Sequence, residues 1–159
     1  EVRKKSPVPI AAGERLYTVR QFKELLDLGA VDYVQPDVSH AGGVTALREI
    51  AALADCHHVS FAPHNPSGPV ANVVTLQLAA CIPNFLILEI MDSDVVWRSE
   101  ITDEALAWEA DCLVIPDKPG IGVFLNEEVL SQYPYTPKDP RHYKGTLTDI
   151  RPPERSCYF

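Results

Sequence analysis

The stretch Val31-Asp32-Tyr33-Val34-Gln35-Pro36 predicts a short buried strand, and the residues that follow it decide the fold class. Gly42-Gly43 predicts a turn. Beyond this turn, apolar side chains recur at the spacing of one helix face, at Val44, Leu47, Ile50, Ala51 and Ala54. A strand followed by an amphipathic helix is the repeating unit of an α/β protein.

The same unit is predicted on the N-terminal side of this stretch. Residues 8–13 form a short, mostly apolar run, which predicts a strand. Thr18-Val19-Arg20-Gln21 has the S/T-x-x-E/Q pattern that marks a helix N-terminus. Gly29 is placed to end that helix, and its apolar positions are Phe22, Leu25 and Leu26.

Two more strands and a helix are predicted on the C-terminal side. Residues 59–63 predict a third strand, and Ser67-Gly68-Pro69 predicts a helix start with proline in the first turn. An apolar run over 70–80 fills this helix, and residues 85–88 predict a fourth strand. Short apolar strands without alternation are typical of parallel sheets covered on both faces. Residues 8–89 therefore predict either an open doubly wound sheet or a (β/α)₈ barrel, and no G-x-G-x-x-G or Walker A sequence favours a nucleotide-binding sheet.

The repeating pattern fades after Glu89. The elements expected there are a short helix within residues 102–110, a turn at 117–120, a strand at 121–125 and a helix that starts at Asn126. From about residue 131 the chain is dominated by proline, tyrosine and charge. We therefore expect a folded region over residues 1–130 and an irregular, extended tail over residues 131–159.

Composition and charge narrow the classes of function. The 159 residues are 46% hydrophobic and 23% charged, which allows a packed core. A net charge of −8 argues against nucleic acid or an anionic membrane as partner, since both require clustered Lys and Arg. The four cysteines form no CxxC pair, no apolar run reaches the roughly 18 residues of a membrane span, and the charged first five residues do not resemble a signal peptide. We therefore expect reduced thiols and a cytoplasmic protein.

A polar residue stands at the C-terminal end of each predicted strand. These residues are Glu14, Asp37, His64 and Glu89, at intervals of 23, 27 and 25 residues. Each interval matches one strand–helix unit, so the four side chains are expected at the same rim of the sheet. Ligands bind and reactions occur at this rim in parallel α/β proteins.

These residue types suit acid–base chemistry on a charged substrate. A histidine beside a carboxylate, as expected for His64 and Asp37, can act as a general base or acid near neutral pH. The Glu14 carboxylate suits Mg²⁺, although a single carboxylate binds Mg²⁺ weakly and more ligands would be needed. A protonated Glu89 in a dry site could donate a hydrogen bond to developing negative charge.

Plainer explanations exist for each residue taken alone. Polar residues commonly follow strands because strand ends become solvated loops. Asp37 could simply open a turn, and Glu14 could pair with Arg15 or Lys23 on the surface. The remaining histidines are weaker candidates than His64; these are His40, His57, His58 and His142. The regular spacing of the four strand-end residues favours a shared function over these separate explanations.

Several segments in a fixed order resemble the enolase superfamily. The segments are Ile10-Ala11-Ala12-Gly13-Glu14-Arg15, Val34-Gln35-Pro36-Asp37-Val38-Ser39-His40-Ala41-Gly42-Gly43, Ala62-Pro63-His64 and Asp117-Lys118-Pro119-Gly120-Ile121-Gly122-Val123. They are similar to the second half of enzymes in the mandelate racemase/muconate lactonizing enzyme branch, above all acid-sugar dehydratases such as galactonate dehydratase. The resemblance covers about residues 8–130. It implies strands five to eight of a (β/α)₇β barrel.

The resemblance implies a role for each strand-end residue. Glu14 matches the last of three acidic Mg²⁺ ligands, Asp37 and His64 match a catalytic Asp–His dyad, and Glu89 matches a glutamate that hydrogen-bonds the substrate carboxylate. The implied reaction removes the proton alpha to the carboxylate of an acid sugar, passes through an enediolate stabilised by Mg²⁺, and loses water to give a 2-keto-3-deoxy acid. A racemase, epimerase or cycloisomerase of the same superfamily is the first alternative.

The chain also departs from the family pattern. A full barrel needs roughly 250 residues, and the chain lacks the first four strands, two metal ligands, the opposite acid/base and the capping domain. Asn65 and Ile90, beside two of the site residues, could also alter the pocket. We expect a fragment that is inactive alone and that pairs with a missing N-terminal half or with another copy of the chain. A non-catalytic module that pairs through open strand edges is the alternative from another class.

Overall fold

The computed structural model describes residues 1–91, 97–103, 106–135 and 137. The elements of its α/β region are helix α1 (Val2–Lys5), strand β1 (Ala11–Ala12), helix α2 (Val19–Asp27), strand β2 (Tyr33–Val34), helix α3 (Gly43–Cys56), strand β3 (Ser60–Phe61) and helix α4 (Pro69–Ala79). The later elements are 3₁₀ helix η1 (Arg98–Glu100), strands β4 (Trp108–Glu109) and β5 (Cys112–Leu113), and helix α5 (Glu127–Gln132). The predicted alternation of strands and helices is confirmed.

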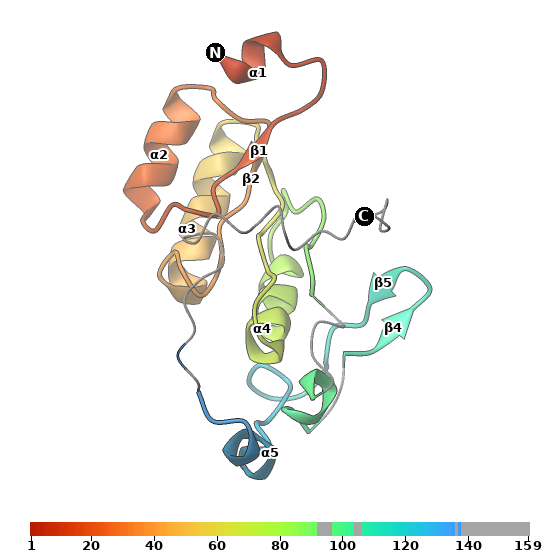
Figure 1. Ribbon diagram of the computed structural model, residues 1–159. Helices are drawn as coiled ribbons and strands as arrows, with labels where there is room; N and C mark the ends of the chain where they lie inside the picture. Colours follow the sequence, from red (N-terminus) through yellow and green to blue (C-terminus); the bar gives the residue numbers. More distant parts are fainter. Residues whose placement is uncertain (92–96, 104–105, 136, 138–159) are drawn as a thin grey trace, which may run out of the picture.

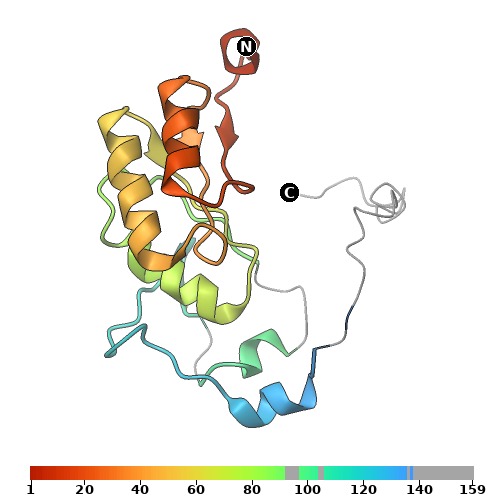
Figure 2. The same cartoon turned by 90° about the vertical axis from the view of Figure 1, so that its left-hand side faces the viewer.

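The first three strands form one parallel sheet in the order β1-β2-β3. Strands β1 and β2 are labelled in Figure 1. Ala12 pairs with Val34, and Val34 pairs with Phe61. Helices α2, α3 and α4 lie together on one side of these strands (Figure 2). Each strand is shorter than its predicted range, and the described residues contain no helix long and apolar enough to cross a membrane.

Proline stops the second and third strands at equivalent places. Pro36 follows Gln35, whose N–H donates to the Ala12 carbonyl at 2.9 Å. Pro63 follows Ala62, whose N–H donates to the Val34 carbonyl at 3.0 Å. Proline has no N–H for the next ladder bond, so both strands end there. The residue after each proline therefore stands just beyond the sheet.

The helix starts follow the sequence signals. Thr18 and Gln21 form the predicted capping box at the start of α2, with Gln21 N–H donating to Thr18 Oγ1 at 3.3 Å. Helix α3 follows Gly42, whose φ of 97° lies in the left-handed region that glycine adopts without strain. Helix α4 begins at Pro69, and Asn126 caps α5 by accepting from Val129 N–H. The predicted starts of α2, α3, α4 and α5 are confirmed.

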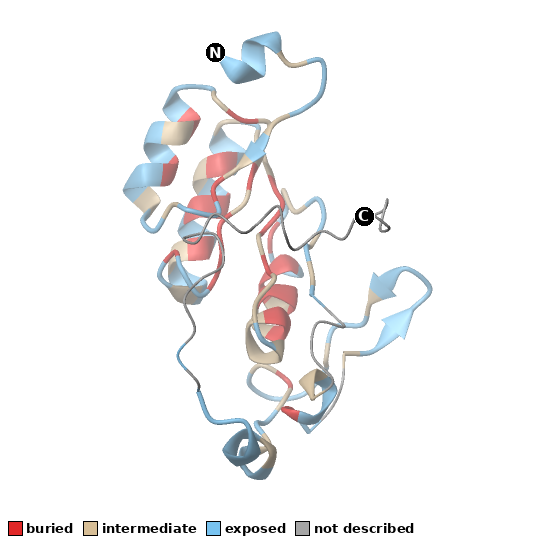
Figure 3. Ribbon diagram, viewed as in Figure 1, coloured by how far each residue is buried: buried red, intermediate tan, exposed pale blue. Residues whose placement is uncertain are grey.

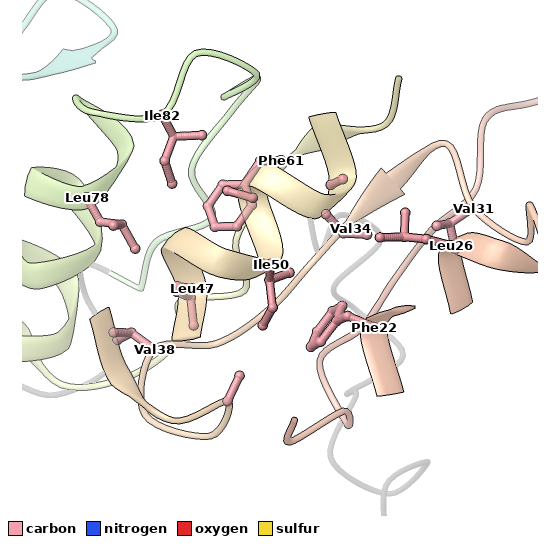
Figure 4. Packing of buried hydrophobic residues seen from close by; sticks show 13 residues of the cluster. Phe22, Leu26, Val31, Val34, Val38, Leu47, Ile50, Phe61, Leu78 and Ile82 are labelled. Carbon is pink, nitrogen blue, oxygen red and sulfur yellow. The ribbon is translucent and has the colours of Figure 1, made fainter. Parts of the chain in front are cut away.

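The core lies between the helices and the strands of the sheet (Figure 4). Its largest fully buried side chains are Phe22, Phe61, Leu47, Ile50 and Val34. They come from α2, α3 and strands β2 and β3, so the apolar stripes predicted for α2 and α3 face the strands. Burying such side chains is the main favourable contribution to folding.

Three predictions after Ala80 need correction. The predicted strand 85–88 is reduced to a single bridge between Phe85 and Phe61, because no strand lies on its outer side in the described residues. The helix predicted within 102–110 is wrong, since Trp108–Glu109 pairs with Cys112–Leu113 in an antiparallel hairpin. The hairpin turns at Ala110, whose φ is 53°. The predicted strand 121–125 is reduced to the Thr102–Leu125 bridge, and most of the predicted tail 131–159 lies outside the described residues.

The hairpin β4–β5 and helix α5 are largely exposed (Figure 3). Apolar residues remain on the surface here, including Ile87 at 63% exposed and Phe124 at 68%. An apolar cleft of about 430 Å³ opens between α4, the chain after Phe85 and the hairpin. The C-terminal side of the molecule therefore presents apolar surface that nothing in the described residues covers.

We predict that Gly13→Ala destabilises the chain far more than Gly68→Ala. Gly13 has a φ of 137°, and a methyl group there would lie 2.7 Å from Cε1 of Phe22. Backbone strain and overpacking each cost about 1–3 kcal/mol. Gly68 has a φ of −69° and open space around it, so the change there should cost less than about 1 kcal/mol. Urea unfolding of both variants would check this, and equal midpoints would contradict it.

We also predict that an ion pair near the N-terminus, between Arg3 and Asp32, stabilises the fold in a pH-dependent way. Arg3 Nε donates to Asp32 at 2.8 Å, and Ile10 N–H donates to the same carboxylate at 2.9 Å. These hydrogen bonds, the Arg3 one foremost, lower the pKa of Asp32 below its ordinary value. The ionised Asp32 carboxylate therefore stabilises the folded state fully above the ordinary carboxyl pKa. This stabilisation is lost as the pH falls through the lowered pKa of Asp32.

Asp32→Asn should accordingly lower the melting temperature near pH 7 and have a shrinking effect as pH falls below about 4. Asp55→Asn, at an exposed position of α3, is the matched control and should show no such pH dependence. Melting curves across this pH range measure both. If the melting temperatures of Asp32→Asn and the unchanged chain differ by the same amount down to low pH, the predicted contribution of the Arg3–Asp32 ion pair is refuted.

Candidate active site

The parallel register brings three of the four strand-end residues to one rim. Ala12, Val34 and Phe61 lie side by side in the sheet. Glu14 follows Ala12 by two residues, and Asp37 and His64 each follow their aligned residue by three. We call this end of the sheet, with Glu14, Asp37 and His64, the rim.

Asp37 and His64 form a hydrogen-bonded pair at the rim. His64 Nδ1 lies 2.8 Å from Asp37 Oδ2, and the Asp37 side chain is only 1% exposed. An ionised carboxylate can only accept, so His64 Nδ1 carries the proton of this bond. The other Asp37 oxygen accepts from Ser39 N–H at 2.7 Å. The pair therefore fixes the orientation of the His64 ring. In the neutral ring the single N–H proton is on Nδ1, so Nε2 is unprotonated.

Glu14 stands on the other side of the same imidazole. Its Oε2 lies 3.5 Å from His64 Nε2, so both ring nitrogens face carboxylate oxygens. Glu14 is half-exposed, and its other oxygen lies 3.4 Å from Arg15 Nε, the surface pair that the sequence also allowed.

Glu89 makes no hydrogen bond or ion pair with Glu14, Asp37 or His64 in the described residues. It is exposed, and its carboxylate makes no hydrogen bond or ion pair within the part of the chain that the structure describes. Phe85 aligns with Phe61, and Glu89 follows it by four residues rather than three. The role predicted for Glu89 stays a prediction.

Two residues near the dyad were undervalued by the sequence analysis. His40 Nδ1 lies 3.9 Å from Asp37 Oδ2, and its ring centroid is 6.3 Å from that of His64. Ser67 Oγ lies 3.5 Å from the same Asp37 oxygen, at the entry to α4. The available signal was the position of His40 three residues after Asp37, because a turn after a strand returns that residue to the strand end. Of the other histidines, His57 and His58 follow the C-terminal end of α3, and His142 lies outside the described residues.

The residues of the rim fit Mg²⁺ only in part. Glu14 offers a half-exposed oxygen of the hard type that Mg²⁺ prefers. Asp37 is committed to His64 and Ser39 and is buried. Among the described rim residues, Glu14 is therefore the one carboxylate suited to Mg²⁺, and further oxygen ligands must come from elsewhere.

Comparison with known proteins places this geometry in context. Residues 1–129 match the family described as enolase C-terminal domain-like. A D-galactonate dehydratase from Variovorax paradoxus is 37% identical over 141 residues, which is 85% of this chain and 37% of the relative. Among solved structures, a mandelate racemase/muconate lactonizing enzyme from Jannaschia superposes with a TM-score of 0.80 at 30% identity, over 87% of this chain and 35% of that one.

A second solved structure was determined with ligands. A Burkholderia xenovorans protein named after L-alanine-DL-glutamate epimerase, bound to magnesium and fumarate, superposes with a TM-score of 0.79 at 36% identity. The match covers 84% of this chain and 33% of that one. The chain thus spans little more than a third of the length of the proteins it resembles.

We predict that Asp37 holds the proton of neutral His64 on Nδ1. In ¹⁵N-histidine spectra of the unchanged chain, the His64 signals should show an Nδ1–H tautomer, because Nδ1 faces the carboxylate. Asp37→Asn should shift His64 toward the other tautomer, whereas Asp55→Asn at an exposed position should leave it unchanged. Identical His64 spectra in all three proteins would show that Asp37 does not set the tautomer.

Proposed function

We propose, since the chain belongs to the enolase C-terminal domain-like family, that it supplies the Asp–His dyad and one Mg²⁺ ligand of an acid-sugar dehydratase. The observation that carries the proposal is the hydrogen-bonded pair of buried Asp37 and His64, with a Glu14 oxygen 3.5 Å from the other nitrogen of the same ring, Nε2. Relatives named D-galactonate dehydratase support an acid sugar as the substrate class.

His64 would act as the base that removes the proton alpha to the substrate carboxylate. Its Nδ1–H is held by Asp37, so the lone pair on Nε2 accepts the proton. The resulting imidazolium would lie 2.8 Å from Asp37 and 3.5 Å from Glu14, and both carboxylates stabilise its charge. The electron pair of the broken C–H bond moves into the enediolate. This intermediate collapses by expelling the β-hydroxyl, which leaves as water with the proton that the His64 imidazolium returns, and the enol product tautomerises to the 2-keto-3-deoxy acid.

Glu14 would hold Mg²⁺ together with ligands from a part of the enzyme that this chain lacks. When bound, Mg²⁺ neutralises the negative charge that develops on the substrate carboxylate. The magnesium in the Burkholderia xenovorans structure supports this assignment for the family. Glu89 would bind the substrate carboxylate once the complete barrel encloses the rim.

A racemase, epimerase or cycloisomerase remains the alternative reaction. The Burkholderia xenovorans relative is named after an epimerase, and such enzymes would share the first proton transfer. The outcome depends on groups that accept or deliver the next proton, and the rim residues described here do not include them. The names of the relatives in sequence favour the dehydratase.

We further propose that the chain is part of a barrel and is inactive alone. β1 has an unpaired outer edge, and Phe85 bridges only to Phe61 in the described sheet. The candidate partners are the missing N-terminal portion and a second copy of the chain, and the span of about a third of the relatives favours the former. A non-catalytic module would remain soluble, bind a partner and ignore Mg²⁺.

The test is a chimera in which this chain replaces the matching C-terminal part of the Variovorax paradoxus relative. With Mg²⁺ and a panel of acid sugars, we expect dehydration by the chimera and no turnover by the 159-residue chain. Turnover by a purified monomer would overturn the fragment proposal. A folded chimera that catalyses neither dehydration nor alpha-proton exchange would overturn the proposed function.

His64→Asn in this chimera should slow exchange of the alpha proton by about 10²–10⁴-fold, because the base is lost, while substrate binding is kept. His57→Asn, at the far end of α3, is the matched control and should leave exchange unchanged. Exchange measured by mass spectrometry in D₂O separates the two variants. Undiminished exchange in His64→Asn would refute the base role even if dehydration were impaired.

A further inference from the structure

We propose that Asp37, His40 and His64 form a binding site for a divalent cation of the Zn²⁺ type, distinct from the Mg²⁺ position at Glu14. Each of the three residues offers one ligand atom, and these atoms lie within 4.8 Å of one another. Two imidazoles and one carboxylate suit Zn²⁺ and its transition-metal neighbours, whereas Mg²⁺ prefers oxygen ligands alone.

The distances from the two histidine nitrogens to Asp37 Oδ2 require only a small adjustment. Asp37 Oδ2 lies 2.8 Å from His64 Nδ1 and 3.9 Å from His40 Nδ1. Bonds of about 2.0–2.2 Å to a tetrahedral ion place neighbouring ligand atoms about 3.3–3.6 Å apart. The first distance must open slightly and the second must close slightly. The His40 side chain is 45% exposed, so it can move without disturbing the core.

The fold itself brings His40 to this place. The Asp37 carbonyl accepts from the N–H groups of His40 at 3.1 Å and Ala41 at 2.8 Å, which closes a turn directly after the strand. That turn returns the His40 ring toward the buried carboxylate and the His64 ring. The carboxylate of Glu14, 3.5 Å from His64, adds a second negative charge that favours a dication.

The proposal has a consequence for catalysis that rests on the proposed function. An ion bound to Asp37 and His64 displaces the proton that joins them and breaks the dyad. Zn²⁺ should therefore inhibit the complete enzyme even when Mg²⁺ is present. Binding itself needs no activity, so it can be tested on the 159-residue chain alone.

Calorimetric titration of the chain with Zn²⁺, in an excess of Mg²⁺, is the decisive experiment. We expect one site that Mg²⁺ does not displace, and at least about tenfold weaker Zn²⁺ binding in His40→Gln. His57→Gln is the matched control. His57 adjoins His58, and its Nε2 lies 3.6 Å from Asp27 Oδ1, so these three residues are the cluster that could compete for Zn²⁺. Circular dichroism of each variant checks that it is folded. His64→Gln, as a second variant, should weaken binding at least as much as His40→Gln.

Three results with Zn²⁺ alone would each overturn the site, and a fourth concerns Mg²⁺. These are the absence of Zn²⁺ binding, unchanged affinity in both His40→Gln and His64→Gln, and a larger loss in His57→Gln than in His40→Gln. Displacement of Zn²⁺ by Mg²⁺ would equally refute a site built on imidazoles. An inactive chimera together with intact Zn²⁺ binding would overturn the proposed function and leave this site standing.

Discussion

The parallel register that aligns Ala12, Val34 and Phe61 is the constraint on which the rest of the structure depends. Side chains alternate between the two faces of a strand, so a slip of one residue would turn the end of that strand to the opposite face. With the register as it is, Asp37 and His64 occupy equivalent positions, each directly after a buried proline. The hydrogen bond between them follows from this equivalence.

The buried carboxylate of Asp37 gives the rim its chemical character. Removing a carboxylate from water is costly unless hydrogen bonds and an opposite charge offset the loss. Ser39 N–H and His64 Nδ1–H donate hydrogen bonds of 2.7 and 2.8 Å to this carboxylate, and Ser67 Oγ lies 3.5 Å from it. The same anion that orients His64 as a base also attracts His40. One buried charge thus underlies both the proposed proton transfer and the proposed metal site.

The sheet is packed by helices at its N-terminal strands but lacks a partner strand beyond Phe85 in the described residues. Helices α2 and α3 bury Phe22, Leu47 and Ile50 against the strands. The chain after Phe85 instead carries exposed apolar residues, and a parallel strand without an outer partner cannot extend its ladder. This contrast agrees with a chain that spans about a third of its relatives.

The sequence by itself determined the order of strands and helices from β1 to α4, the helix caps at Thr18 and Asn126, and which polar residue follows each of the first three strands. Those features depend on neighbours along the chain, such as a capping side chain or a proline. Only the tertiary structure decided that Glu14 and Asp37 meet on opposite sides of His64, that His40 returns to the same carboxylate, and that residues 108–113 form a hairpin. These outcomes depend on strand register and on partners distant in sequence, which local patterns do not specify.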